Sequence, residues 1–531
     1  MLGSLLKSGV EIVNDPSKAD AVIVNTCSFI DAAQEESVDT ILESTEFRAQ
    51  SRPGQAVIVS GCLPQRFRED LPKLLPEVDV FMGIDQVEQV GALVEQALTV
   101  RGEKRKQEAA SGKVPSKKAV QKRLNELEKA NPGHSHEGEE SVRGTEKFGK
   151  TKKVIAAPVP SSTQVTLRPN YIPQHDTPRF RLTPKHFAYV KIAEGCNHPC
   201  SFCIIPRMRG SHRSRVQSDI VAEAKRLLSE GVKELNLISQ DSTYYGLDLR
   251  ANHSRAISSP EKFKAATQAL PADATTLSSL LRELNALKGD FWIRLLYTHP
   301  AHWTDELIQT IAECKKVARY VDMPLQHIQD DMLQRMRRET SGQYIRELIQ
   351  RIRKGIPGIT LRTTFIVGFP GETESHFKTL LDFITETRFE RLGIFAYSQE
   401  DGTVAGKMAG QLTPAKRQKR RELAMVAQHS VAVGVSESFV GRTLKVLVEG
   451  EASNNDLAKA NISSWEHRLI RKNGRSASKP KAKHSYWVAR GEADAPDIDG
   501  RIYIQGEVKA GAFAKVRIIG HTDYDLIAEP V

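Results

Sequence analysis

The sequence has no long apolar run and few cysteines. No stretch of roughly 18 or more apolar residues occurs, and residues 1–7 lack the charged head and apolar core of an export signal. Six cysteines among 531 residues are too sparse for a disulfide scaffold, and their clustering indicates metal ligation in a reducing compartment. We therefore expect a cytoplasmic protein without a membrane segment.

No internal repeat is present, and the length exceeds what one hydrophobic core supports, so several domains are expected. Hydrophobic residues make up 40% and charged residues 27%, which is ordinary globular composition and excludes a wholly disordered chain. The predicted divisions are an N-terminal domain at 1–98, a basic disordered linker at 99–180, a central domain at 182–432 and a C-terminal domain at 435–531.

The N-terminal domain alternates β-branched runs at 21–27, 56–62 and 78–82 with amphipathic segments. This pattern is typical of buried parallel strands in an open α/β, flavodoxin-like fold. Cys27 and Cys62 each follow directly on a strand, at the sheet edge where ligands usually bind.

The central domain repeats strand-like and helical patterns, which predicts a partial (β/α)6 barrel with its site at the C-terminal ends of the strands. The C-terminal domain is rich in strand patterns and is expected to be a small antiparallel β-barrel, with a polar insertion at 451–483. The expected strands of the two domains are 186–192, 234–238, 292–296, 321–324, 361–367 and 391–395, followed by 443–448, 486–488, 500–504 and 514–519.

The net charge of +11 is concentrated in short basic segments such as 101–106 and 147–153. Such segments favour a polyanionic partner, for example RNA or a ribosome, because attraction to phosphate needs little specific geometry. A solvated, disordered linker explains the same residues equally well. Residues 120–129 within the linker could form an isolated helix.

Three cysteines form the most specific motif of the sequence. Cys196, Cys200 and Cys203 lie in one short loop directly after a predicted strand. Thiolates are the usual ligands of iron–sulfur clusters, and three of them leave one iron of a four-iron cluster open. A structural zinc ion is the alternative, but it needs four ligands and no fourth cysteine is near; His198 could complete such a site, yet it lies inside the tight loop.

The CxxxCxxC spacing, with Phe202 before its last cysteine, resembles the radical S-adenosylmethionine (SAM) superfamily. The flanking residues 195–215 are similar to its methylthiotransferase family, as are Cys27, Cys62 and the terminal barrel, which resembles a TRAM domain. The resemblance implies a cluster on Cys196, Cys200 and Cys203 that binds SAM and yields a 5′-deoxyadenosyl radical, a second four-iron cluster in the first domain, and RNA contact through the TRAM domain or the linker.

Two branches of this family compete. The runs at 239–243, 324–327 with 336–338, and 395–403 resemble the RimO branch, whereas the MiaB branch, which modifies tRNA, usually has other residues there. Glu400 and Asp401 would also be poor neighbours for tRNA phosphates. The RimO resemblance implies a methylthio group added to the β-carbon of an aspartate in ribosomal protein S12 of the small subunit. The electron donor and the sulfur source are not indicated.

The second cluster has only two matching ligands, Cys27 and Cys62, because the family's third lies close to the true N-terminus. A misplaced start codon or a real loss of the ligand would explain this. The first is favoured, since a sheet without its first strand exposes an edge that folded proteins avoid. If the ligand is lost, the chain could instead be an RNA- or ribosome-binding protein without full catalysis.

Four residues are candidates for SAM binding. Phe202 belongs to the cysteine loop, and Gln240 ends a barrel strand beside Asp241. Gly368 and Glu372 bound a turn that resembles the family's SAM-contacting turn, although a plain turn is the alternative. Cys314, His299 and His327 have more ordinary roles: Cys314 is expected to be a packing residue, and lone histidines are more often framework than ligands.

Overall fold

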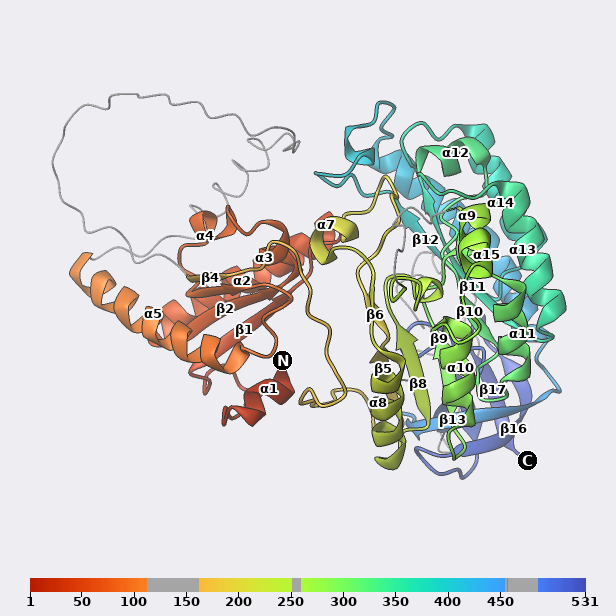
Figure 1. Cartoon of the computed structure of the whole chain (residues 1–531), viewed down its shortest axis with the longest axis horizontal. Coiled ribbons are helices and arrows are strands. Elements are labelled where there is room, and N and C mark those ends of the chain that lie inside the picture. The colour runs from red at the N-terminus through yellow and green to blue at the C-terminus, as the bar shows by residue number, and fades with distance from the viewer. Residues whose placement is uncertain (112–161, 251–258, 454–455, 457–485) are drawn as a thin grey trace.

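The computed structural model describes residues 1–111, 162–250, 259–453, 456 and 486–531. An N-terminal α/β domain lies beside a larger body, which combines the partial barrel with the C-terminal barrel (Figure 1). None of the described helices is long and apolar enough to cross a membrane.

The N-terminal domain is built on a four-stranded parallel sheet in the order β1 (Ala21–Thr26), β2 (Ala56–Gly61), β3 (Val80–Met82) and β4 (Ser162–Gln164). Apolar residues cover both faces, because alternate strand residues pack against opposite helix layers. The helices are α1 (Leu2–Lys7) and α5 (Val90–Ser111) on one face, and α2 (Asp31–Ser51), α3 (Cys62–Arg66) and α4 (Leu71–Leu74) on the other.

The predicted linker at 99–180 is partly wrong. Helix α5 continues to Ser111, and β4 extends the sheet by pairing with β3. Two of the four basic residues at 101–106 have internal partners: Arg101 donates to the carbonyl of Pro53 at 2.8 Å, and Lys104 to that of Val78 at 2.6 Å. These two charges are therefore structural. The predicted helix at 120–129 and the basic segment at 147–153 lie outside the described residues.

The partial barrel contains the six predicted strands, all parallel, in two three-stranded sheets that the bridge between Ile293 and Val317 joins. The strands are β5 (Phe187–Lys191), β8 (Glu234–Ile238), β9 (Trp292–Leu295), β10 (Tyr320–Asp322), β11 (Thr360–Val367) and β12 (Arg391–Ala396). A short antiparallel pair, β6 (Ala193–Glu194) and β7 (Arg213–Ser214), frames the cysteine loop.

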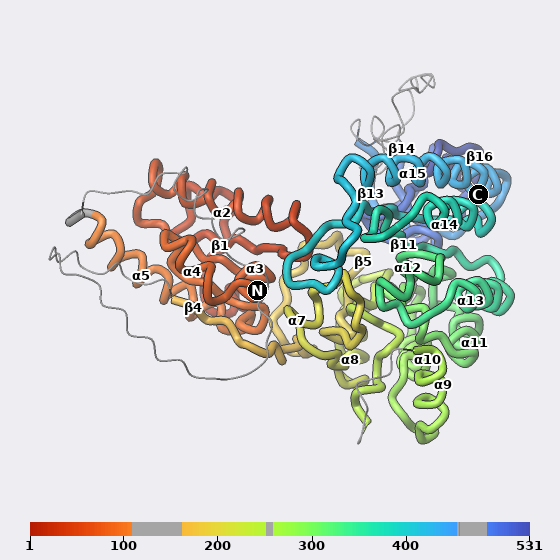
Figure 2. The backbone as a smooth tube through the Cα atoms, turned by 90° about the horizontal axis from the view of Figure 1, so that it is seen from above, coloured from red at the N-terminus to blue at the C-terminus, as the bar shows by residue number. Residues whose placement is uncertain are grey.

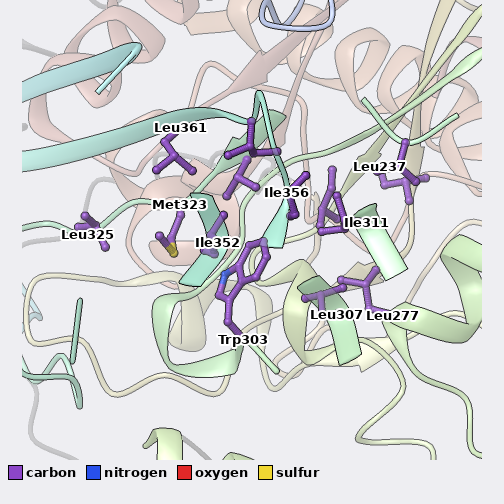
Figure 3. Packing of buried hydrophobic residues seen from close by; sticks show 14 of the residues in the cluster. Leu237, Leu277, Trp303, Leu307, Ile311, Met323, Leu325, Ile352, Ile356 and Leu361 are labelled. Carbon is purple, nitrogen blue, oxygen red and sulfur yellow. The ribbon is translucent and has the colours of Figure 1, made fainter. Parts of the chain in front are cut away.

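Amphipathic helices close the outside of the barrel, as in the packing around Ile352 and Ile356 (Figure 3). In α13, buried Ile345, Leu348 and Ile352 recur at helical spacing. Cys314 is buried in the same core, so the packing role expected for it is confirmed. The helices are α7 (Ile205–Arg209), α8 (Gln217–Ser229), α9 (Pro260–Gln268), α10 (Leu277–Ala286), α11 (Asp305–Glu313), α12 (Asp330–Arg335), α13 (Gly342–Gly355), α14 (Glu374–Thr387) and α15 (Pro414–Glu437), with the 3-10 turns η1 (Ser242–Tyr244), η2 (Pro300–His302) and η3 (Ala405–Lys407).

The C-terminal domain is a closed five-stranded barrel, which confirms the predicted architecture. One pairing differs from the expected antiparallel pattern, because β15 and the unpredicted β17 run parallel and close the barrel. The strands are β13 (Thr443–Glu451), β14 (Tyr486–Gly491), β15 (Ile502–Gln505), β16 (Phe513–His521) and β17 (Leu526–Pro530). Most of the predicted insertion at 451–483 lies outside the described residues.

Candidate active site

The three-cysteine loop lies at the C-terminal end of β5, and Cys196, Cys200 and Cys203 line one cavity of about 520 Å³. Gly195 makes the turn into this loop with φ +83°, and its N–H donates to Oε1 of Gln240 at 2.7 Å. A side chain at Gly195 would meet the carbonyl oxygen of Ser211 at 2.2 Å, so only glycine fits. The end of β8 therefore fixes the start of the loop.

Ser201, between Cys200 and Cys203, binds the C-terminal end of α12. Ser201 N–H donates to the carbonyl of Met336 at 3.0 Å, and its hydroxyl to that of Arg335 at 2.8 Å. Arg338 places Nη1 3.6 Å from the Cys200 sulfur and donates through Nη2 to the carbonyl of Pro324 at 2.7 Å. The motif segments 324–327 and 336–338 thus meet beside the cysteine loop. Arg338 brings a positive charge to the Cys200 sulfur.

The surroundings of the thiols fit a cationic cluster. Burial raises the pKa of Cys196 well above its usual range, and the Asp241 carboxylate adds to the shift. Burial also raises the pKa of Cys203 to about 12, with Cys200 as the next cause. Buried thiols of this kind deprotonate when a metal takes up their charge. Three sulfurs around one cavity, and no fourth cysteine nearby in the sequence, match a cluster with one open iron.

His198 supports the loop from beneath. Its Nε2 lies 2.9 Å from Oδ2 of Asp241, which also lies 2.7 Å from Nδ1 of His302. The ring of His198 stacks on that of His299 at 3.5 Å between centroids. The three histidines offer nitrogens within 4.8 Å of one another, but stacked rings cannot direct their lone pairs at one ion, and Asp241 occupies two of the nitrogens. The arrangement is a buried hydrogen-bond network rather than a zinc site.

Burial and hydrogen bonding together set the charge of this network. It lowers the pKa of His198 to about 4 and holds that of His299 well below its usual range. For Asp241, burial raises the pKa, but the interactions with His302 and His198 outweigh it and hold the value well below the usual range. At neutral pH the carboxylate is therefore charged and accepts hydrogen bonds from the rings.

The predicted SAM-binding residues divide into two groups. Phe202 and Gln240 line the cavity. Gly368 and Glu372 are not among its lining residues: Gly368 has φ +74° and donates to Oε2 of Glu372 at 3.0 Å, while Oε1 of Glu372 accepts from Arg420 at 2.5 Å. The turn is thus held by its own hydrogen bond and by Arg420 of α15. Its contact with SAM stays a prediction.

Cys27 and Cys62 lie next to each other because Thr26 of β1 pairs with Gly61 of β2. Each cysteine is the residue after its strand, so both reach the C-terminal edge of the sheet. Cys27 is exposed and Cys62 is half-buried. The six cysteines of the sequence include no third one in this domain, so the second cluster stays a prediction.

The two cysteine sets share their surroundings. Arg209, which lines the cavity, places Nη2 3.5 Å from the Cys62 sulfur and pairs with Glu194 at 2.6 Å. Phe29, two residues after Cys27, lines the same cavity. Sequence reasoning gave these residues no role, and it also missed Tyr297 and Arg338 in the lining. Their signal was present in part, because Tyr297 follows β9 and Arg338 belongs to the motif at 336–338.

The family models that match the chain follow the domain order. They are the Radical SAM superfamily over residues 190–384, the Uncharacterized protein family UPF0004 over 1–83, and the TRAM domain over 480–531. Three relatives, from Opitutus terrae, Akkermansia muciniphila and Geobacter sulfurreducens, are each named "Ribosomal protein uS12 methylthiotransferase RimO". They are 47%, 41% and 37% identical over 100% of this chain and cover 93%, 95% and 94% of their own lengths.

Solved structures are more remote. The radical SAM methyltransferase TsrM from Kitasatospora setae, with tryptophan and a SAM analogue, is 13% identical and has a TM-score of 0.39, covering 78% of this chain and 64% of its own. Coproporphyrinogen III oxidase (HemN) from Escherichia coli is 18% identical with a TM-score of 0.33, covering 46% and 52%.

A partial barrel with three cysteines around a cavity, matched by the superfamily model, defines a radical SAM iron–sulfur enzyme. Within this class, the chain is similar over its full length to three relatives that share one name. The chain belongs to the RimO family of methylthiotransferases.

Proposed function

We propose that this enzyme adds a methylthio group to the β-carbon of an aspartate in ribosomal protein uS12. The observation that carries the proposal is the full-length likeness to relatives named for this activity. The shared surroundings of the two cysteine sets support it, since methylthio transfer needs a sulfur source next to the radical site.

Cys196, Cys200 and Cys203 would hold a [4Fe-4S] cluster that, with bound SAM, supplies the radical needed to open an unactivated C–H bond. The residues of this chain orient and shield that chemistry. Phe202 and Gln240 would contact SAM at the cavity, and Arg338 would offset negative charge at Cys200. Phe29 adds apolar surface to the cavity from the N-terminal domain.

Cys27 and Cys62 would hold the second [4Fe-4S] cluster together with one further ligand. Arg209 contributes a positive charge beside Cys62 and is kept in place by Glu194. The partner would be uS12, free or in the small ribosomal subunit, with the TRAM domain as the RNA-contacting module.

The test is an anaerobic reaction of the iron- and sulfide-reconstituted chain with SAM, a reductant and uS12, followed by mass spectrometry of the aspartate-bearing peptide. We expect the methylthio adduct with the native chain and none with Cys200→Ala. Modified tRNA alongside unmodified uS12 would transfer the assignment to the MiaB branch. Iron content is measured in parallel, because about eight irons per chain indicate two four-iron clusters and about four indicate one.

A further inference from the structure

Glu400 is a buried carboxylate where the N-terminal domain meets the partial barrel. It lies in the segment between β12 and η3, which approaches α2 in Figure 2, and is only 3% exposed. Its Oε1 accepts from the Asp31 N–H at 2.9 Å, and its Oε2 accepts from Gln34 at 3.2 Å and from Arg66 Nη1 at 3.3 Å. We call Glu400 and these three partners the Glu400 clasp.

Helix α2 depends on this carboxylate at its first turn. Its N-cap is Ile30, whose side chain offers no acceptor for the free N–H groups. Glu400 provides the acceptor from another domain, and its negative charge lies at the positive end of the helix. The start of α2, four residues after Cys27, is therefore held by the barrel.

Arg66 ties the second cysteine segment to the same carboxylate. It ends α3, the short helix that begins at Cys62. Its Nη1 also donates to the carbonyl of Ser28 at 2.8 Å, and its Nη2 to the main-chain carbonyl of Asp401 at 2.8 Å. The Arg66 and Glu400 side chains are 8% and 3% exposed, so each would be costly to leave unpaired.

The barrel side of the clasp leads to the SAM-cluster loop. The Thr403 hydroxyl donates to the Glu400 carbonyl at 2.7 Å, and the Ala405 N–H donates to the carbonyl of Ser201 at 2.8 Å. Ser201 lies between Cys200 and Cys203 in the sequence. A continuous series of short contacts therefore joins the Cys196–Cys203 loop, through Glu400, to the segments that carry Cys27 and Cys62.

We propose that Glu400 is a positioning residue that holds the Cys27 and Cys62 edge against the radical cavity and so couples SAM cleavage to methylthio transfer. This inference rests on the proposed function. Glu400 does not line the cavity and touches none of the cysteines. Its loss should therefore leave radical generation in place and misplace the sulfur-bearing edge.

The variants are Glu400→Ala, which removes both acceptor oxygens, and Glu400→Gln, which keeps one acceptor without the charge. The matched control is Asp401→Asn, because the exposed Asp401 contributes only its main-chain carbonyl to Arg66. On the metal-free chain, hydrogen exchange should be faster in peptides covering 28–36 for Glu400→Ala, intermediate for Glu400→Gln and native for the control, with the barrel peptides unchanged.

On the reconstituted chain, 5′-deoxyadenosine and methylthiolated uS12 are measured together. In Glu400→Ala we expect methylthio transfer to fall about tenfold to a hundredfold, because small misplacements of reacting groups have effects of this order, while SAM cleavage and iron content stay native. The ratio of the two products separates positioning from a general loss of structure.

Three outcomes would overturn the inference. An unchanged product ratio in Glu400→Ala, with an active native chain, overturns it alone. Parallel loss of iron, SAM cleavage and transfer in Glu400→Ala shows a folding role and overturns it too. Unmodified uS12 with the native chain removes the proposed function and this inference together.

Discussion

At the scale of single residues, buried carboxylates carry much of the organisation. Asp241 accepts from two histidine rings and from the Thr243 N–H at 3.0 Å, so one side chain joins the cysteine loop, η1 and η2. In a buried network, every unsatisfied member has a large energetic cost. The charge of Asp241 is therefore part of the loop's support.

Replacing Asp241 by asparagine tests this support. Asp241→Asn removes the negative charge and one of the two acceptor oxygens, while the ring N–H groups of His198 and His302 stay buried. We therefore expect a loss of about 1–3 kcal/mol in the free energy of unfolding. Iron retention should fall as the loop loosens. Urea unfolding of the metal-free chain and iron per chain after desalting measure both effects. Exposed Asp273→Asn is the control, and equal behaviour of the two variants would contradict the role.

Asp525 predicts a pH dependence of stability in the terminal barrel. Burial raises its pKa from 3.8 to about 6, although the Arg501 N–H donates to its Oδ1 at 2.8 Å. Because folding raises this pKa, the stabilising contribution is complete below about pH 4 and is lost as the pH rises through 6. The free energy of unfolding of Asp525→Asn, relative to that of the native chain, should therefore rise by about 3 kcal/mol between about pH 4 and pH 8.

Unfolding curves of both metal-free chains at several pH values measure this growth. Asp273→Asn should show no comparable trend, because that side chain is exposed. A pH-independent difference for Asp525→Asn would show that the buried carboxyl does not titrate in this range.

At the scale of elements, the sequence predicted those whose patterns reflect burial. The strands β8 and β11 are recognisable because their apolar residues face packed layers. Helix α5 was cut short at 98 because Arg101 and Lys104 look like solvent-exposed charges, whereas both bond internally to carbonyls. Long-range pairing of this kind leaves no local sequence pattern. The same holds for β4, whose three polar residues form a strand because they pair with β3.

The cysteine loop was predictable from its spacing, but its supports were not. The CxxxCxxC motif indicates the ligands by itself. The contacts of Ser201 with Met336 and of Arg209 with Cys62 join segments more than a hundred residues apart. The Glu400 clasp is also invisible in the sequence, since no local rule assigns an N-cap from another domain.

Gly195 and Gly231 have similar positive φ angles but different surroundings, so substitutions at the two positions distinguish backbone strain from a steric clash of the added Cβ. Gly195 has φ +83° and no room for a Cβ, whereas Gly231 has φ +93° and open space. Gly231→Ala should cost about 1–2 kcal/mol of unfolding free energy through backbone strain alone and keep its iron. Gly195→Ala should also displace the loop from Ser211 and lose iron. Iron content and thermal unfolding check both, and full iron retention in Gly195→Ala would contradict the tight turn.

At the scale of the whole molecule, the C-terminal barrel docks at the end of the partial barrel opposite the cysteine loop (Figure 1). Glu234, the first residue of β8, is fully buried and pairs with Arg294 and with Arg490 of β14, each at 2.6 Å. Arg391 and Asp494 form a second buried pair across the junction at 2.5 Å. A partner bound to the TRAM domain would therefore lie at the end of the partial barrel that is remote from the cavity, although buried ion pairs connect the two barrels.

Breaking this junction should affect both domains at once. Glu234→Gln leaves Arg294 buried without a countercharge and Arg490 with Glu449 alone, so we expect a loss of about 3–5 kcal/mol in the free energy of unfolding. Glu386→Gln, which breaks an exposed pair with Arg346, is the matched control and should cost only about 0–1 kcal/mol. Because Glu234 is far from the cysteines, iron content at low temperature should stay native while limited proteolysis releases the terminal barrel more readily. Equal costs for the two variants would mean that the buried charges are compensated by other groups, and the two barrels would then be joined by apolar packing instead.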